Sequence, residues 1–207
     1  MSSSASTTRR PDQDSAYRGE NLIFLISQPK SGSTLLQRVL AGQPDIHTSA
    51  ETWLMLHPVY GLRTRGIRTD FNSNWAATGV QEFLDNYAEG RQTYFAGIRS
   101  FAETVYGSVL ARSGKRWFLD KTPRYTMIVS ELYELFPRAR YLLLFRNPLA
   151  ILNSELNTYV KGEWDILSQF APDLVDAPGR MIDARAILGN SAFELRYEDL
   201  VTDPDRL

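Results

Sequence analysis

An apolar run that opens directly into a short polar loop limits the folds open to this chain more than any other feature. Residues 22–26 (LIFLI) form the run and residues 27–32 (SQPKSG) the loop. Apolar residues then recur at helical spacing from residue 33 until Gly42 and Pro44 stop the pattern. A helix N-terminus after a tight loop binds phosphate or sulfate, because its first N–H groups lack intrahelical partners and its dipole favours negative charge. The segment therefore predicts an anion site at the end of a buried strand.

The residue types in this loop suit a phosphate-bearing ligand. Lys30 adds a positive charge, Gly32 lets an anion approach the backbone, and Ser33 and Thr34 supply hydroxyls. A nucleotide-triphosphate P-loop reads G-x-x-x-x-G-K-[ST], with its lysine directly after the second glycine. Here the lysine precedes Gly32 by two residues and no upstream glycine opens the loop. A P-loop kinase that uses ATP is thus a disfavoured alternative, as is a plain strand-to-helix turn with an incidental lysine.

Composition excludes several other classes of function. The net charge of −1 over 207 residues gives no basic field for nucleic acid or an anionic membrane, and no apolar stretch approaches the length of a membrane span. The chain has no cysteine and only two histidines, so we predict no metal site. A cysteine-free chain suits a reducing compartment, and we expect a cytoplasmic location. Residues 1–20 are polar, without a secretory signal, and read as a disordered tail.

Short apolar segments alternate with helical patterns after residue 20. Strands are expected at 22–26, 45–50, 116–119, 140–145 and 192–197, helices at 33–41, 80–88, 91–112, 125–136, 148–160, 179–188 and 203–207, and irregular loops at 58–79 and 162–178. This alternation predicts an α/β, three-layer P-loop-type fold with a central parallel sheet flanked by helices. Ligands bind such sheets at the carboxyl ends of the strands. Lys30, Lys121 and Arg146 each follow a predicted strand, so three cations should meet at one edge.

Five motifs together resemble the sulfotransferases that use 3′-phosphoadenosine 5′-phosphosulfate (PAPS). Residues 29–34 (PKSGST) resemble their 5′-phosphosulfate loop. Arg146, with Pro148 two residues on and Ser154 in the following helix, resembles their 3′-phosphate element, where a guanidinium grips phosphate bidentately and a hydroxyl adds a donor. Residues 49–53 (SAETW) and 119–123 (LDKTP) resemble the glutamate and lysine segments of tyrosylprotein sulfotransferases and related bacterial enzymes. Residues 193–200 (FELRYEDL) resemble their Tyr-Glu-Asp-Leu segment.

This resemblance implies transfer of a sulfuryl group from PAPS to an acceptor hydroxyl, with no metal. Carried over residue by residue, it implies a 5′-phosphosulfate site of Lys30, Ser31, Gly32, Ser33 and Thr34, a 3′-phosphate site of Arg146 and Ser154, and Tyr197 beside the adenine. Glu51 becomes the candidate general base. Lys30 and Lys121 would stabilise charge on the departing nucleotide. The residues leave the acceptor open between carbohydrate, lipid, polyketide-type and tyrosine hydroxyls.

Each role has a plainer alternative. Glu51 would cap a helix that begins near Thr52, Lys121 would only pair with Asp120 or another acid, and Tyr197 would be core packing. His57 is a minor candidate base. Family members continue past the Tyr-Glu-Asp-Leu segment into a basic loop that closes over the nucleotide. The resemblance therefore implies that the domain at 21–207 lacks its C-terminal part, and a non-catalytic nucleotide-binding module is the alternative to an enzyme.

Overall fold

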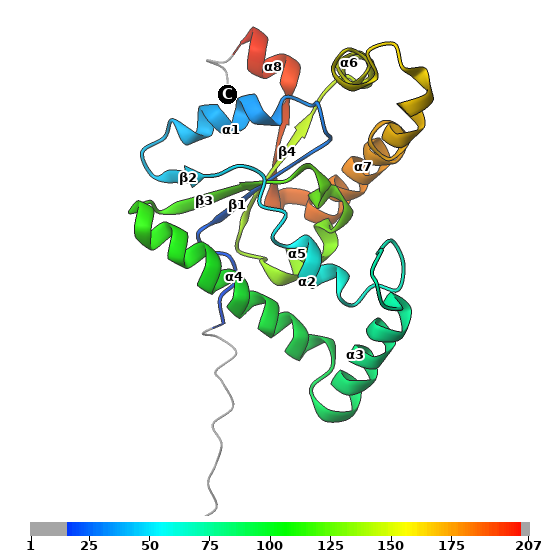
Figure 1. Cartoon of the computed structure of the whole chain (residues 1–207). Helices are drawn as coiled ribbons and strands as arrows, with labels where there is room; N and C mark the ends of the chain where they lie inside the picture. Colours follow the sequence, from blue (N-terminus) through cyan, green and yellow to red (C-terminus); the bar gives the residue numbers. More distant parts are fainter. Residues whose placement is uncertain (1–15, 204–207) are drawn as a thin grey trace, which may run out of the picture.

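A parallel sheet with helices on both faces forms the centre of the molecule, as the computed structural model of residues 16–203 shows (Figure 1). Its strand order is β2-β3-β1-β4-β5, and all four strand pairs are parallel. The strands are β1 (Leu22–Ser27), β2 (Ile46–Thr48), β3 (Trp117–Lys121), β4 (Arg140–Phe145) and β5 (Ala192–Arg196). The α-helices are α1 (Ser33–Ala41), α2 (Leu56–Tyr60), α3 (Ser73–Tyr87), α4 (Arg91–Ser113), α5 (Val129–Leu135), α6 (Pro148–Glu155), α7 (Ala177–Leu188) and α8 (Tyr197–Thr202). The predicted fold class is confirmed.

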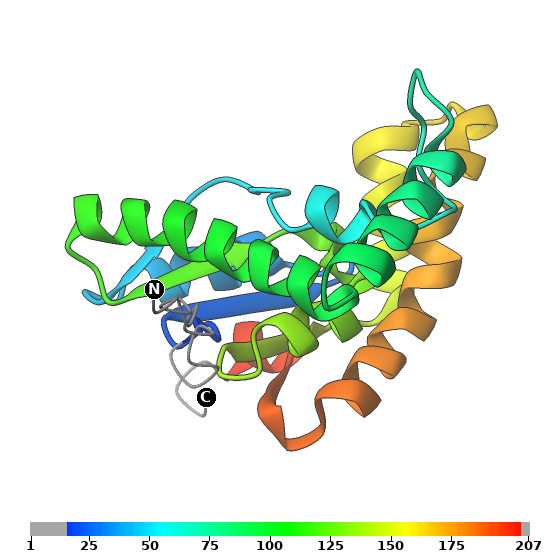
Figure 2. The same ribbon diagram turned by 90° about the horizontal axis from the view of Figure 1, so that it is seen from below.

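Strand β1 lies at the middle of the sheet because both of its faces are apolar. All six of its residues are buried. Leu22, Phe24 and Ile26 point into the larger core, to which α4, α5 and α7 contribute, whereas Ile23 and Leu25 point into a smaller core beneath α1 and α8. Side chains alternate between the two faces of a strand, so one apolar run supplies both layers. Figures 1 and 2 show the two helical layers from different sides.

Two stretches that were expected to be loops contain helices. Helix α3 begins at Ser73 because the Asn72 side chain accepts hydrogen bonds from the backbone N–H groups of Asn74 and Trp75. The loop expected at 58–79 is therefore wrong at its two ends, where residues 58–60 belong to α2 and residues 73–79 belong to α3. The stretch 162–178 folds into a 3₁₀-helix at Trp164–Phe170 and a π-helical turn at Pro172–Asp176. These segments pack through isolated aromatic and acidic side chains, which give no helical periodicity.

Several predicted elements have different ends in the structure. The helix expected at 125–136 divides into a 3₁₀-helix at Pro123–Met127 and α5, and the helix expected to run to residue 160 changes at Leu156–Val160 into a π-helical turn. Strand β5 ends at Arg196, and the next residue begins α8. The expected helix start at Asp203 is wrong, since its N–H closes α8 on the Asp199 carbonyl. The rest of that predicted helix, 204–207, lies outside the described residues.

The packed chain begins before the expected boundary at residue 20. Tyr17 lies edge-on against Phe136, with ring centroids 6.1 Å apart, and the Arg18 carbonyl accepts a hydrogen bond from the Arg138 N–H. Gly19 is buried in a left-handed conformation against Phe136. The final residues of the expected tail are therefore part of the domain, and residues 1–15 lie outside the described residues.

Candidate active site

Residues that follow or end strands β1, β2, β3 and β4 line one cavity of about 470 Å³. Its lining includes most of the predicted site residues, namely Lys30, Gly32, Ser33, Thr34, Glu51, Lys121, Arg146 and Ser154. Four separate segments of the chain bring these residues together. Ser31 and Tyr197 are the two predicted site residues that do not line it.

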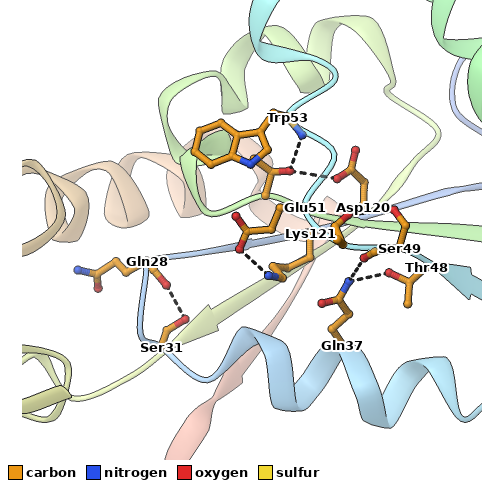
Figure 3. A network of polar contacts seen from close by, with 11 residues as sticks. Gln28, Ser31, Gln37, Thr48, Ser49, Glu51, Trp53, Asp120 and Lys121 are labelled. Carbon is orange, nitrogen blue, oxygen red and sulfur yellow. Dashed lines mark hydrogen bonds and ion pairs between the residues drawn. The ribbon is translucent and has the colours of Figure 1, made fainter. Parts of the chain in front are cut away.

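The loop after β1 is a compact turn that exposes the N-terminus of α1. Lys30 and Gly32 have positive φ angles of 59° and 89°, and Ser31 is buried, with its hydroxyl donating to the Gln28 carbonyl at 2.7 Å (Figure 3). Ser31 therefore shapes the loop, and its hydroxyl does not reach the cavity. The first backbone hydrogen bonds of α1 run from the N–H groups of Leu35 and Leu36 to the Gly32 carbonyl. The N–H groups that precede Leu35 therefore have no acceptor within the helix. The arrangement suits an anion.

Arg146 is fixed at the edge of this loop by contacts on several sides. Its Nη1 donates to the Lys30 carbonyl at 2.7 Å, and its Cζ lies 4.2 Å from the centroid of the Tyr197 ring. The next residue, Asn147, donates its N–H to the Glu198 carboxylate at 2.8 Å and caps α6. Within residues 16–203, the buried Nε of Arg146 has no hydrogen-bond partner. Arg146 is thus held rigidly and keeps donor capacity for a ligand.

Tyr197 supports the loop from the side away from the cavity. A Cβ atom added at Gly32 would lie 2.2 Å from the Tyr197 ring, a separation that real Cβ atoms do not show. The ring is thus packed directly on the glycine and beneath Arg146. Its expected contact with adenine stays a prediction. Its observed packing shows why a glycine is needed at the helix start beyond its positive φ.

Replacing Gly32 by alanine is expected to destabilise the protein by more than its left-handed strain alone, because the new methyl group drives Tyr197 out of place. Gly162 is a matched control, since its φ is 91° and, among the described residues other than its chain neighbours, no atom lies within 4 Å of the place that an alanine methyl group would take. Gly162→Ala should cost only the left-handed strain of about 1–2 kcal/mol. Urea unfolding of the wild type and the two variants measures the losses. Equal losses in the two variants would contradict the packing argument.

Glu51 and Lys121 form an ion pair inside the cavity, with 2.7 Å between Oε1 and Nζ (Figure 3). The lysine side chain is 5% exposed and the glutamate side chain 34%. The segment before Glu51 is fixed from two sides. Gln37 of α1 donates to the Thr48 hydroxyl and to the Ser49 carbonyl, and Thr48 donates to the Leu119 carbonyl of β3, each at 2.7 Å.

The structure removes one of the alternatives considered for these residues. Glu51 does not cap a helix, since α2 begins only at Leu56. Lys121 does pair with an acid, as its plainer alternative held, and this acid is Glu51 and not Asp120. His57 is exposed and His47 packs against Phe118, and neither lines the cavity.

A buried carboxylate locks the two strand ends that carry Glu51 and Lys121. Asp120 accepts hydrogen bonds from four hydroxyl groups, those of Thr52, Tyr106, Thr122 and Tyr125, at 2.6–3.3 Å. Burial raises the pKa of Asp120, and the four hydroxyl donors oppose this shift. Because the network joins the residue after Glu51 to the residue before Lys121, it sets the position of the ion pair.

Sequence reasoning missed a second group of cavity residues. These residues lie close to the predicted site residues in the chain or in the irregular stretch 162–178. They are Trp53, Pro123, Arg124, Glu155, Tyr159, Phe170 and Asp173. Glu155 directly follows the predicted Ser154, and this adjacency was the available signal. Asp173 and Phe170 lie in a stretch without periodicity, and no pattern marked them.

Comparison with known proteins places the chain in a family. The model of the sulfotransferase family matches residues 22–206. The chain belongs to this family. Nodulation protein NoeE of Sinorhizobium fredii (strain NBRC 101917 / NGR234) is 40% identical over 142 residues, which cover 67% of this chain and 32% of NoeE. Protein-tyrosine sulfotransferase A of Caenorhabditis elegans is 26% identical over 205 residues, 96% of this chain and 50% of that protein.

The fold of the family is also found in solved structures. The sulfotransferase domain from the curacin biosynthetic pathway has a TM-score of 0.61 at 23% identity, over 93% of this chain and 71% of that domain. The chain spans 32% to 50% of the length of the curated relatives that it matches. In residues 16–203, no helix is long and apolar enough to cross a membrane. The same residues contain no group of three or more Asp, Glu, His or Cys side chains that could hold a metal ion.

Proposed function

We propose that this chain carries the donor site and the reacting groups of a sulfotransferase that moves a sulfuryl group from PAPS to an acceptor hydroxyl. Family membership supports the reaction class. The observation that carries the proposal is the meeting of Lys30, Lys121, Arg146 and the α1 N-terminus around one cavity that also holds Glu51. Cations and helix donors suit an anionic donor, and the carboxylate suits an acceptor that must lose a proton.

The residues fit the two charged ends of PAPS. The turn at Lys30 and Gly32 and the N–H groups that open α1 would hold the 5′-phosphosulfate. Arg146, whose buried Nε has no partner among the described residues, would hold the 3′-phosphate together with Ser154. The bound donor supplies the sulfuryl group. Tyr197 would support Gly32 and Arg146 through the packing of its ring. The contact of this ring with the adenine of PAPS stays a prediction.

The roles of Glu51 and Lys121 follow from their pairing. Lys121 occupies Oε1 of Glu51, and we assign Oε2 to the proton of the acceptor hydroxyl. Lys121 is nearly buried, so its charge acts in a site of low dielectric and stabilises negative charge that develops nearby. Lys30 carries the same role at the turn, where its ammonium lies 4.3 Å from the centroid of the Tyr159 ring. A cytoplasmic location also remains a proposal, supported by the cysteine-free sequence.

Replacing Arg146 by alanine is expected to weaken binding of 3′-phosphoadenosine 5′-phosphate by about 10- to 100-fold, since hydrogen bonds to a charged group contribute about 1.5–3 kcal/mol. Arg140 provides the control, because it lies at the other end of the same strand and is exposed. Calorimetric titration of the wild type, Arg146→Ala, Lys30→Ala and Arg140→Ala measures the affinities. Unchanged binding in Arg146→Ala, or a wild type that prefers ATP with Mg²⁺, would contradict the proposed donor site.

A further inference from the structure

Glu155 is a buried acid that the donor site leaves unexplained. It is the last residue of α6, its exposed fraction is 0%, and it lines the cavity. Within residues 16–203, neither of its carboxylate oxygens has a hydrogen-bond partner. Buried polar atoms are nearly always paired, because an unpaired one loses its hydration without compensation. Two unpaired carboxylate oxygens on a residue that lines a cavity therefore indicate a ligand that donates hydrogen bonds.

The charges around Glu155 are already committed elsewhere. Arg124 donates from both Nη atoms to the Asp173 carboxylate, and the Lys30 ammonium lies over the Tyr159 ring. Burial and the negative charge of Asp173 raise the pKa of Glu155, whereas Lys30 and Arg124 lower it. The two cations thus offset the charge of Glu155 through space but do not supply its hydrogen bonds. What Glu155 lacks is donors rather than positive charge.

The wall around Glu155 has apolar faces. A π-helical turn follows it at once and carries Tyr159, which stacks on Phe170 with 5.3 Å between centroids and 8° between planes. Trp53 lines the same cavity with 44% of its surface exposed. π-helical turns inside helices often occur at functional sites. Aromatic faces beside an unpaired carboxylate suit a ligand with both C–H surfaces and hydroxyl groups.

We propose that Glu155 is an acceptor-binding residue whose two oxygens accept hydrogen bonds from neighbouring hydroxyls of a neutral polyol. This inference rests on the proposed function, because it assigns Glu155 to the acceptor of that reaction. An anionic acceptor is disfavoured by the charge of Glu155, and a cationic one by Lys30 and Arg124. A neutral diol supplies two donors without added charge, one for each oxygen.

The test uses the 207-residue chain and two probes. Methyl β-D-glucopyranoside represents a neutral polyol, and N-acetyl-L-tyrosinamide represents an acceptor with a single hydroxyl. Ligand-observed NMR titration, with 3′-phosphoadenosine 5′-phosphate at saturation, compares the wild type with Glu155→Gln. Glu163→Gln, which removes an exposed acid eight residues further on, is the control. Glu155→Gln is expected to weaken glucoside binding about tenfold or more, with nucleotide and tyrosinamide binding unchanged.

Each other result overturns the inference. If the wild type does not bind the glucoside, a neutral polyol is not the acceptor. If Glu155→Gln binds the glucoside as tightly as the wild type, Glu155 is not an acceptor-binding residue. Weaker nucleotide binding in Glu155→Gln would assign the carboxylate to the donor. A wild type that fails to bind the nucleotide refutes the proposed donor site instead, and the glucoside titration is then judged without nucleotide by the same criteria. If Glu155→Gln does not fold, Glu155→Asp, which withdraws the carboxylate by one methylene, takes its place.

Discussion

Replacing Glu51 by glutamine is expected to lower kcat by about 10²–10⁴-fold while nucleotide binding stays unchanged, because the amide cannot take a proton from the acceptor. The side-chain oxygen of glutamine still accepts the hydrogen bond from Lys121, so the geometry of the pair is kept. Initial rates of sulfate transfer from radiolabelled PAPS to the probe that the wild type sulfates measure kcat. Calorimetric titration measures nucleotide affinity.

A double-mutant comparison separates proton transfer from simple charge pairing. If Glu51 served only to hold Lys121, Glu51→Gln would have no effect in a Lys121→Met background. We expect a further loss of at least about tenfold in that background, since the base is still removed. Equal rates of the Lys121→Met single variant and the double variant would refute the general-base role.

Replacing Asp120 by alanine is expected to reduce the free energy of unfolding by about 2–6 kcal/mol, because two buried tyrosine hydroxyls each lose their acceptor at a cost of about 1–3 kcal/mol. Tyr106 is almost completely buried, and its hydroxyl donates to Asp120 at 2.6 Å. Alanine leaves this hydroxyl and that of Tyr125 without their acceptor. Urea unfolding, followed by far-UV circular dichroism, measures the loss.

Two further variants test that the loss comes from the network. Tyr106→Phe removes one donor and should cost about 1–2 kcal/mol, less than Asp120→Ala. Asp165→Ala removes an exposed acid and should change stability by no more than about 0.5 kcal/mol. A loss in Asp120→Ala no larger than in Asp165→Ala would mean that the four hydroxyl groups find other partners.

The sheet was predictable because its strands are short, apolar and separated by helical patterns. β1 and β4 show this most clearly, since each reads as a continuous apolar run ended by a polar loop. The α3 start was signalled by Asn72 and was missed because the first two turns, residues 73–79 (SNWAATG), hold one large apolar residue and the poor helix formers Thr78 and Gly79. The large residue, Trp75, is 79% exposed. Periodicity fails where a helix presents aromatic residues to solvent.

The site was predictable where a cationic residue closely follows or ends a predicted strand, since the carboxyl ends of parallel strands meet at one edge of the sheet. Lys30, Lys121 and Arg146 are of this kind, and the structure brings them to one cavity. Asp120 and Glu155 are not, because their meaning depends on neighbours that lie far away in the chain. Asp120 receives the hydroxyl of Thr52 across 68 residues, and Glu155 is influenced by Lys30 and Asp173. Only tertiary structure reveals such environments.

The strand order has a consequence for the time course of folding. β1 pairs with β3 and β4, which lie about a hundred residues further along the chain, and β5 adds to the far side of β4. Pairings of such long range form late. Arg146 packs on Tyr197, which begins α8 directly after β5, and donates to the carbonyl of Lys30, which follows β1. The proposed ligand site is therefore complete only when both the long-range pairings of β1 and the edge strand have formed. Recovery of nucleotide binding should therefore coincide with the slowest refolding phase, and the ligand would act as a reporter of the completed sheet.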